Sequence, residues 1–237
     1  MCEMNKKQTN RPVIAEPDDT SGLLGHEIDN EKGGERQKKF GWATVDQYII
    51  FDLEATCWDG PRDESQCSEV IEIGAVKLDA SATHIDTLQT FIRPTINPVL
   101  SAFCIDLTSI QQNDVDHAPS FSEAMDTFAQ WICKGSTDIM LVSFGHYDKN
   151  QILEESKAKG YSGDIVRLLD NHRSIKHDLA DLRKVRVRGL KRTLRMLGIP
   201  HDGTLHRGID DAMNTAKIFR VVFDEWKEMV IRRQSNG

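Results

Sequence analysis

Residues 48–60, YIIFDLEATCWDG, form the stretch that decides the fold. Its first half is an apolar run rich in β-branched and aromatic residues, which predicts a buried central strand. The run ends in two carboxylates, Asp52 and Glu54, separated by a single leucine. Residues two apart in a strand point to the same face, so both acids could bind one Mg²⁺ or Mn²⁺ ion. Taken alone, the pair is better explained as an ordinary acidic strand end that faces solvent.

Composition bounds the class of protein. The chain has 237 residues, 39% of them hydrophobic, which suits one sizeable domain with extensions. No apolar run approaches the roughly 20 residues that cross a bilayer, and the first residues do not resemble a secretory leader, so we expect no membrane association and a cytoplasmic location. The five cysteines include no C-x-x-C pair, which argues against a zinc site or a disulfide framework, and Cys57 is expected to be a buried structural thiol. A net charge of −7 argues against generic binding of nucleic acid but leaves a local basic groove open.

The order of the predicted elements indicates an α/β fold. Residues 1–46 are polar and predict a flexible tail, 47–230 form the domain, and 231–237 form a short second tail. Apolar runs at 70–78 and 87–93 closely follow the first strand and predict an antiparallel meander. A capping box at Ser120 and Glu123 predicts a helix, residues 139–143 predict a fourth strand, and another helix opens at Asp148. We therefore expect a mixed β-sheet flanked by α-helices.

A basic run precedes the last helix. Leu190, Leu194 and Leu197 predict an amphipathic helix that ends at Gly198 and Pro200. Between residues 184 and 195 no acid occurs, and the basic residues are Lys184, Arg186, Arg188, Lys191, Arg192 and Arg195. This run indicates either a solvated helix face or the wall of a groove that follows phosphates, and the sequence leaves both open.

Further candidate site residues lie at the ends of predicted elements. The last helix starts after residue 208 and has an apolar stripe formed by Ala212, Ala216, Phe219, Phe223, Trp226 and Val230. Asp211 lies in its first turn, His206 lies five residues earlier, and Asp148 follows the fourth strand. Each alone has an ordinary explanation, such as a helix cap. Together with the first acid pair they form a set that a sheet can bring to one place.

Three motifs resemble the DEDDh subgroup of DnaQ-like 3′-to-5′ exonucleases: Asp52-x-Glu54, Asp148 in SFGHYDKNQI, and His206-x-x-x-x-Asp211 in HRGIDDAMNTAKI. The flanks EATC, RPTINPVLSAFCIDLTSIQQNDVDHAPSF and GTLHRGIDDAMNTAKI are similar to the Eri-type exoribonucleases, which include the histone mRNA 3′-end exonuclease and bacterial homologues. The resemblance extends over residues 47–222 and implies a ribonuclease H-like (DnaQ-like exonuclease) fold. Two departures stand out: residues 1–46 do not resemble the SAP domain of the longer animal members, and Phe144 stands where bacterial relatives often have Trp.

The resemblance implies a metal-dependent 3′-to-5′ exoribonuclease that hydrolyses phosphodiester bonds at RNA 3′ ends, single-stranded or with a short overhang. It implies two Mg²⁺ ions, replaceable by Mn²⁺, that clamp the scissile phosphate, with Asp52 bridging them. Glu54 and Asp211 would bind the ion on the nucleophile side, and Asp148 the second ion. His206 would be the general base that accepts a proton from the attacking water. The five-residue spacing from His206 favours Asp211 over its neighbour Asp210 as the ligand.

The resemblance also suggests how a 3′ end is held. The backbone of Ala55 and Thr56 would contact the terminal sugar, and Phe103, Leu107 and Tyr147 would pack against the terminal base. Phe103 and Leu107 fit equally well as core residues. Two other functions stay open: a DNA 3′-to-5′ exonuclease or proofreading subunit, and a non-catalytic RNA-binding module of the same fold.

Overall fold

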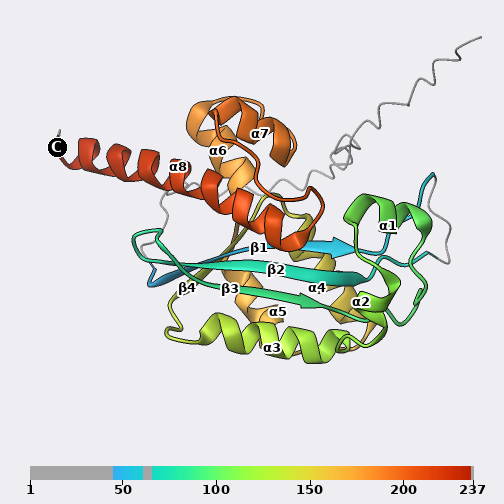
Figure 1. Ribbon diagram of the computed structural model, residues 1–237. Helices are drawn as coiled ribbons and strands as arrows, with labels where there is room; N and C mark the ends of the chain where they lie inside the picture. The colour runs from blue at the N-terminus through green and yellow to red at the C-terminus, as the bar shows by residue number, and fades with distance from the viewer. Residues whose placement is uncertain (1–44, 61–65, 236–237) are drawn as a thin grey trace, which may run out of the picture. The chain divides into compact units, whose positions relative to one another are not determined.

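A five-stranded sheet forms the centre of the domain (Figure 1). The computed structural model describes residues 45–60 and 66–235, with side chains described through residue 228. The strand order is β3-β2-β1-β4-β5, so β1 (Gln47–Ala55) is the middle strand. Tyr48, Ile49, Ile50 and Phe51 are fully buried because β1 is covered on both faces. The predicted buried central strand is confirmed.

The sheet is mixed. β2 (Val70–Asp79) runs antiparallel to β1, and β3 (His84–Phe91) runs antiparallel to β2, which confirms the predicted meander. β4 (Ile139–Ser143) runs parallel to β1, and β5 (His172–Ser174) runs parallel to β4. Because β1 and β4 are parallel, their carboxyl ends lie at the same edge of the sheet.

Helices cover both faces of the sheet. One face packs against α3 (Phe121–Cys133), α4 (Tyr147–Ala158) and α5 (Asp164–Leu168), and η1 (Leu169–Asn171) follows α5. The other face packs against α6 (Ile175–Arg183), α7 (Leu190–Leu197) and α8 (Gly208–Ser235). Two short helices, α1 (Ala102–Thr108) and α2 (Gln112–Asp116), share a small core of their own with Ile71 of β2.

Local signals in the sequence account for several of these elements. Ser120 and Glu123 form the predicted capping box at the start of α3. The stripe of α8 is buried at Ala212, Ala216, Phe219, Phe223 and Trp226, whereas the side chain of Val230 lies outside the described residues.

The structure describes the two predicted tails to different extents. Most of the predicted N-terminal tail lies outside the described residues, and α8 continues through residue 231 to Ser235. In the part of the chain that the structure describes, no helix combines the length and hydropathy needed to span a membrane.

Candidate active site

Asp52 and Glu54 point from β1 toward the face that α8 covers. They have the same parity along the strand as Tyr48 and Ile50, which pack in the core with α8. Glu54 is buried, and a register irregularity follows it, between Glu54 and Ala55. Asp52 is half-buried, so the acid pair lies at the end of β1 with Glu54 inside the fold.

Asp211 reaches the same place from the first turn of α8. Its Oδ2 accepts a hydrogen bond from the backbone N–H of His206 at 3.0 Å. His206 has a φ of 59°, the left-handed region that a side chain other than glycine rarely adopts. The potential ligand atoms of Glu54, His206 and Asp211 all lie within 4.8 Å of one another.

Asp148 comes from α4, which packs on the sheet face opposite to α8. It is buried in the first turn of α4, and its Oδ1 accepts a hydrogen bond from the backbone N–H of Leu53 at 3.2 Å. That contact places its charge beside both members of the acid pair. The structure thus brings together the five predicted residues Asp52, Glu54, Asp148, His206 and Asp211.

The acids destabilise one another as anions. Burial raises the pKa of Asp52 well above its usual range, and repulsion from Asp148, Glu54 and Asp211 raises it further. Burial, followed by repulsion from Asp211, raises the pKa of Glu54 to about 9. Burial likewise raises the pKa of Asp148 to about 6, against hydrogen bonds that lower it.

These residues fit a divalent cation. Buried carboxylates without a compensating positive charge cost free energy, and a hard cation with oxygen ligands removes that cost. Asp211 Oδ1 is buried and has no hydrogen-bond partner among the described residues, so one carboxylate oxygen is left for such a ligand. Asp210 does not compete for this position, because its Oδ2 accepts from the backbone N–H of Thr204 at 2.8 Å.

Glu72 is a fifth acid of the site that the sequence analysis missed. It lies opposite Glu54 on β2 and is fully buried. Its carboxylate accepts from the backbone N–H of Gly208 at 3.0 Å and from Arg207 Nε and Nη2 at 3.2 Å each. Glu72 therefore fastens the start of α8 to the sheet, and Arg207 neutralises it. An acid in the middle of the apolar run VIEIGAV was the signal that could have identified it.

His201 is a second residue near the site that the sequence did not identify. Its Nε2 lies 3.6 Å from Asp211 Oδ1, and neither atom has a hydrogen-bond partner among the described residues. Positions 201, 206 and 211 are spaced by five, and this spacing is visible in the sequence. A spacing of five matches neither helical nor strand periodicity, so it did not identify His201.

The expected nucleotide-holding residues border the acids. Ser101 Oγ donates to the carbonyl of Cys57 at 2.6 Å, and the Cys104 thiol to the carbonyl of Ala55 at 3.8 Å, so α1 is tied to the end of β1. Phe103 and Leu107 are half-buried on α1 and do not belong to the buried core.

Other members of that set differ in exposure. Tyr147, next to Asp148, is 54% exposed. The backbone N–H of Thr56 donates to the carbonyl of Glu69 at 2.8 Å, so that group is already engaged. Cys57, the expected structural thiol, is half-buried and interacts with the thiol of Cys104.

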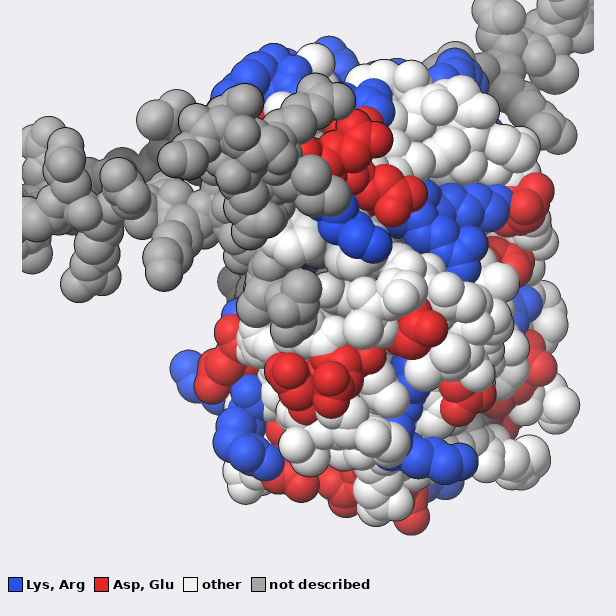
Figure 2. All heavy atoms as spheres, turned by 90° about the vertical axis from the view of Figure 1, so that its left-hand side faces the viewer, with Lys and Arg blue, Asp and Glu red and all other residues white. Residues whose placement is uncertain are grey.

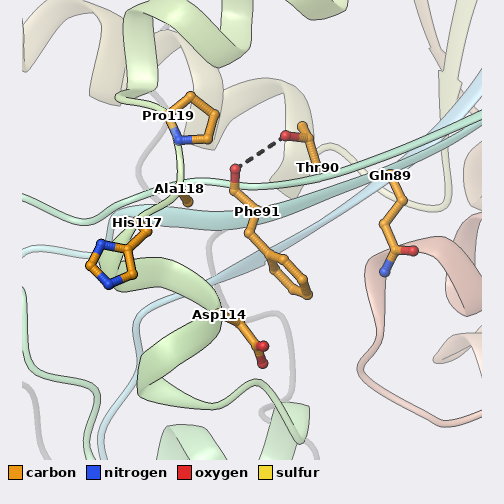
Figure 3. A pocket seen from close by; sticks show the side chains of 7 residues that line it. All are labelled: Gln89, Thr90, Phe91, Asp114, His117, Ala118 and Pro119. Carbon is orange, nitrogen blue, oxygen red and sulfur yellow. Dashed lines mark hydrogen bonds between the residues drawn. The ribbon is translucent and has the colours of Figure 1, made fainter.

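A separate open hollow of about 400 Å³ lies between β3 and α2 (Figure 3). Its lining includes none of the predicted site residues and consists of Gln89, Thr90, Phe91, Asp114, His117, Ala118 and Pro119. Gln89 Nε2 donates to Glu72 at 2.6 Å, and the guanidinium of Arg207 lies 5.5 Å from the Phe91 ring centre. The hollow thus adjoins the contacts that hold Arg207, and not the acids themselves.

Comparison with known families matches residues 49–219, which include the four predicted acids and His206, to the exonuclease family (RNase T). The chain belongs to this exonuclease family. Its structural neighbours confirm the predicted ribonuclease H-like, DnaQ-like fold. Among solved structures, the nuclease domain of 3′hExo, described as a DEDDh family member bound to rAMP, has a TM-score of 0.69 and 30% identity over 76% of this chain and 93% of that chain.

The curated relatives confirm the resemblance to Eri-type exoribonucleases. Human ERI1 exoribonuclease 2 is 30% identical over 81% of this chain and 30% of its own length. Rat 3′-5′ exoribonuclease 1 is 30% identical over 81% of this chain and 57% of its own length. The chain therefore spans between about a third and three fifths of these relatives.

Proposed function

We propose that this member of the exonuclease family is a metal-dependent 3′-to-5′ exoribonuclease with its catalytic domain in residues 47–230. The observation that supports this most is the convergence of Asp52, Glu54, Asp148 and Asp211, from three separate elements, around one edge of the sheet. RNA is the favoured substrate because the relatives at about 30% identity are named exoribonucleases. The substrate would be an RNA 3′ end, single-stranded or with a short overhang.

The four acids would hold two Mg²⁺ ions, replaceable by Mn²⁺. When bound, the ions supply Lewis-acid stabilisation of the phosphate charge and lower the pKa of a water molecule. Asp52 would bind both ions, Glu54 and Asp211 would bind the ion on the nucleophile side, and Asp148 would bind the second ion. The clustering of Glu54 and Asp211 with His206 supports this division.

His206 would accept the proton of the attacking water. A neutral imidazole is suited to this role near neutral pH, provided that the ring is held in place. The hydrogen bond from its backbone N–H to Asp211 fixes the loop, and the Glu72–Arg207 pair fixes the residue after it. Phe103, Leu107 and Tyr147 would pack against the terminal base, and the backbone at Ala55 and Thr56 would face the terminal sugar.

The test uses 5′-labelled RNA and DNA oligonucleotides of one sequence, incubated with the full chain and Mg²⁺. We expect a ladder that shortens from the 3′ end, faster for RNA, and abolished by EDTA or by Asp52→Ala. Asp211→Asn should also abolish it, whereas Asp210→Asn should not, because an Asn at 210 still accepts from Thr204. Faster loss of DNA would assign a DNA exonuclease. RNA binding without any degradation would assign a non-catalytic module.

A further inference from the structure

Six cations form a basic surface on α7 and the segment that leads into it. All six are exposed: Lys184, Arg186, Arg188, Lys191, Arg192 and Arg195. None of the six is in an ion pair with an acid within the described parts of the chain. Figure 2 shows Lys and Arg side chains gathered along the upper margin of the molecule, at the height at which α6 and α7 lie in Figure 1.

The fold turns these charges outward. Leu194 is buried in the core that α8 shares with the sheet, and Leu190 and Leu197 pack against that core. The apolar face of α7 is therefore used inside the domain, which leaves the basic face to solvent. A solvated helix face would explain why these cations are exposed. It would not explain why no acid occurs at any of the twelve consecutive positions 184–195.

The basic surface belongs to the layer formed by α6 and α7. This layer approaches the acid cluster at the start of α6 and again after the end of α7. At the start of α6, the backbone N–H of Lys176 donates to the carbonyl of Phe144 at 3.0 Å, four residues before Asp148. His177 stacks on His146, with ring centres 4.7 Å apart. At the other end, α7 leads through residues 198–205 directly to His206. The layer lies on the same sheet face as Asp52 and Glu54, and α1 lies at the end of β1.

We propose that the basic surface binds the phosphates of an RNA strand upstream of the 3′ end that is held at the acid cluster, an inference that rests on the proposed function. A protein of net charge −7 with clustered acids repels a polyanion, so a local run of exposed cations in the layer that adjoins the site offsets that repulsion. Cations that neutralise phosphates release counterions, and this gives affinity without sequence preference. The surface would thus favour long strands over short ones.

The test compares Lys191→Gln/Arg192→Gln with the unmodified full chain. Affinity for a 5′-labelled 20-nucleotide single-stranded RNA is measured in Ca²⁺ at several salt concentrations, and hydrolysis of a trinucleotide is measured in Mg²⁺. Losing two phosphate contacts should weaken 20-mer binding about tenfold at 0.1 M salt and make the slope of log K against log salt shallower by about 1.4. Hydrolysis of the trinucleotide, which lacks the upstream phosphates of the 20-mer, should not change.

The charge-matched control is Lys157→Gln/Arg167→Gln, which removes one exposed Lys and one exposed Arg from α4 and α5 on the opposite layer; Arg167 forms an exposed ion pair with Asp164 at 3.1 Å, which this variant also removes. An equal loss of affinity in this control, or an unchanged affinity and salt slope in the test variant, would overturn the proposal. So would loss of binding to anionic phospholipid vesicles by the test variant with RNA binding intact, because the surface would then recognise membranes. If the unmodified chain binds the 20-mer in Ca²⁺ but degrades neither the 20-mer nor the trinucleotide in Mg²⁺, the proposed exonuclease activity fails while the surface stands.

Discussion

The two histidines near Asp211 should differ sharply in their effect on catalysis. His206 is grouped with Glu54 and Asp211, whereas His201 lies outside that group, with its Nε2 3.6 Å from Asp211 Oδ1. We expect His206→Asn to lower the single-turnover rate on RNA by about 10²–10⁴-fold, which is the usual contribution of a general base. We expect His201→Asn to lower it by less than about tenfold, through a small displacement of the Asp211 carboxylate.

Mn²⁺ affinity, measured by calorimetry, separates these roles from metal binding. His206→Asn should bind Mn²⁺ almost as well as the unmodified chain, because its proposed role is to take a proton. A large loss of Mn²⁺ affinity in this variant would make His206 a ligand and would contradict the assignment. Equal rate losses in the two variants would assign the proton transfer to the pair.

The sequence predicted the positions of those site residues that a local pattern identifies. Asp52 and Glu54 end an apolar strand with a spacing of two, and Asp211 follows His206 by five. Glu72 was not predicted as a site residue, because its position depends on contacts with Arg207 and Gly208, 135 and 136 positions away. A local pattern shows that an acid interrupts a strand, but it does not show which cation reaches it.

At the scale of elements, a close glycine contact sets the position of α8. A Cβ on Gly74 of β2 would lie 2.0 Å from the backbone nitrogen of Ile209, so the backbone itself would have to move. We expect Gly74→Ala to displace the first turn of α8 and with it Asp211. The exonuclease rate should fall by about 10²-fold, since a displacement of about 1 Å has that effect, and overpacking should cost about 1–3 kcal/mol of stability.

Gly145→Ala is the control for this contact, because its added Cβ meets no atom closer than Tyr147 N at 3.9 Å. Thermal unfolding should show a Tm decrease of several degrees for Gly74→Ala and little change for Gly145→Ala. An active Gly74→Ala variant with unchanged Tm would show that α8 adapts freely, and that the contact does not fix the site.

Elements with strong local signals in the sequence were predictable. Features that depend on pairing or packing within the sheet were not. The capping box identified α3, and the leucine spacing identified α7. β5 was missed because it has three residues, too few for any alternation, and pairs only with β4. The contact between Gly74 and α8 depends on how β2 and α8 pack, and no local pattern contains that information.

For the whole molecule, parallel pairing explains why the site forms where it does. β1 and β4 end at the same edge, so the acids of β1 meet Asp148, which follows β4. Open α/β sheets commonly bind ligands beyond the carboxyl ends of their parallel strands. α8 crosses the same edge at its first turn and adds Asp211. The concentration of acids at one edge also affects the stability of the entire domain.

Without metal, the domain should lose stability as pH rises from 7 to 9. The pKa of Glu54 is raised to about 9, so the folded state keeps a proton there that the unfolded chain has released, and the raised pKa of Asp52 acts in the same direction. The folded state therefore binds more protons, and the free energy of unfolding falls with pH. His172, whose pKa burial lowers to about 3, gives the opposite slope only below about pH 6.5, outside this window. Inside the window, the hydrogen bond with Cys57 lowers the pKa of the Cys104 thiol to about 7, and this opposes the trend, but it is one group against two acids.

Metal should reverse this trend, because the ions bind the ionised acids and their binding strengthens as pH rises. The Tm difference between 5 mM Mg²⁺ and EDTA should therefore grow from pH 7 to pH 9, by at least about 3 °C. Asp52→Asn should flatten both curves, since it removes a mutually repelling carboxylate and a proposed ligand together. A Tm difference that stays constant with pH, or one that Asp52→Asn leaves intact, would mean that Mg²⁺ stabilises the protein at a place other than these acids.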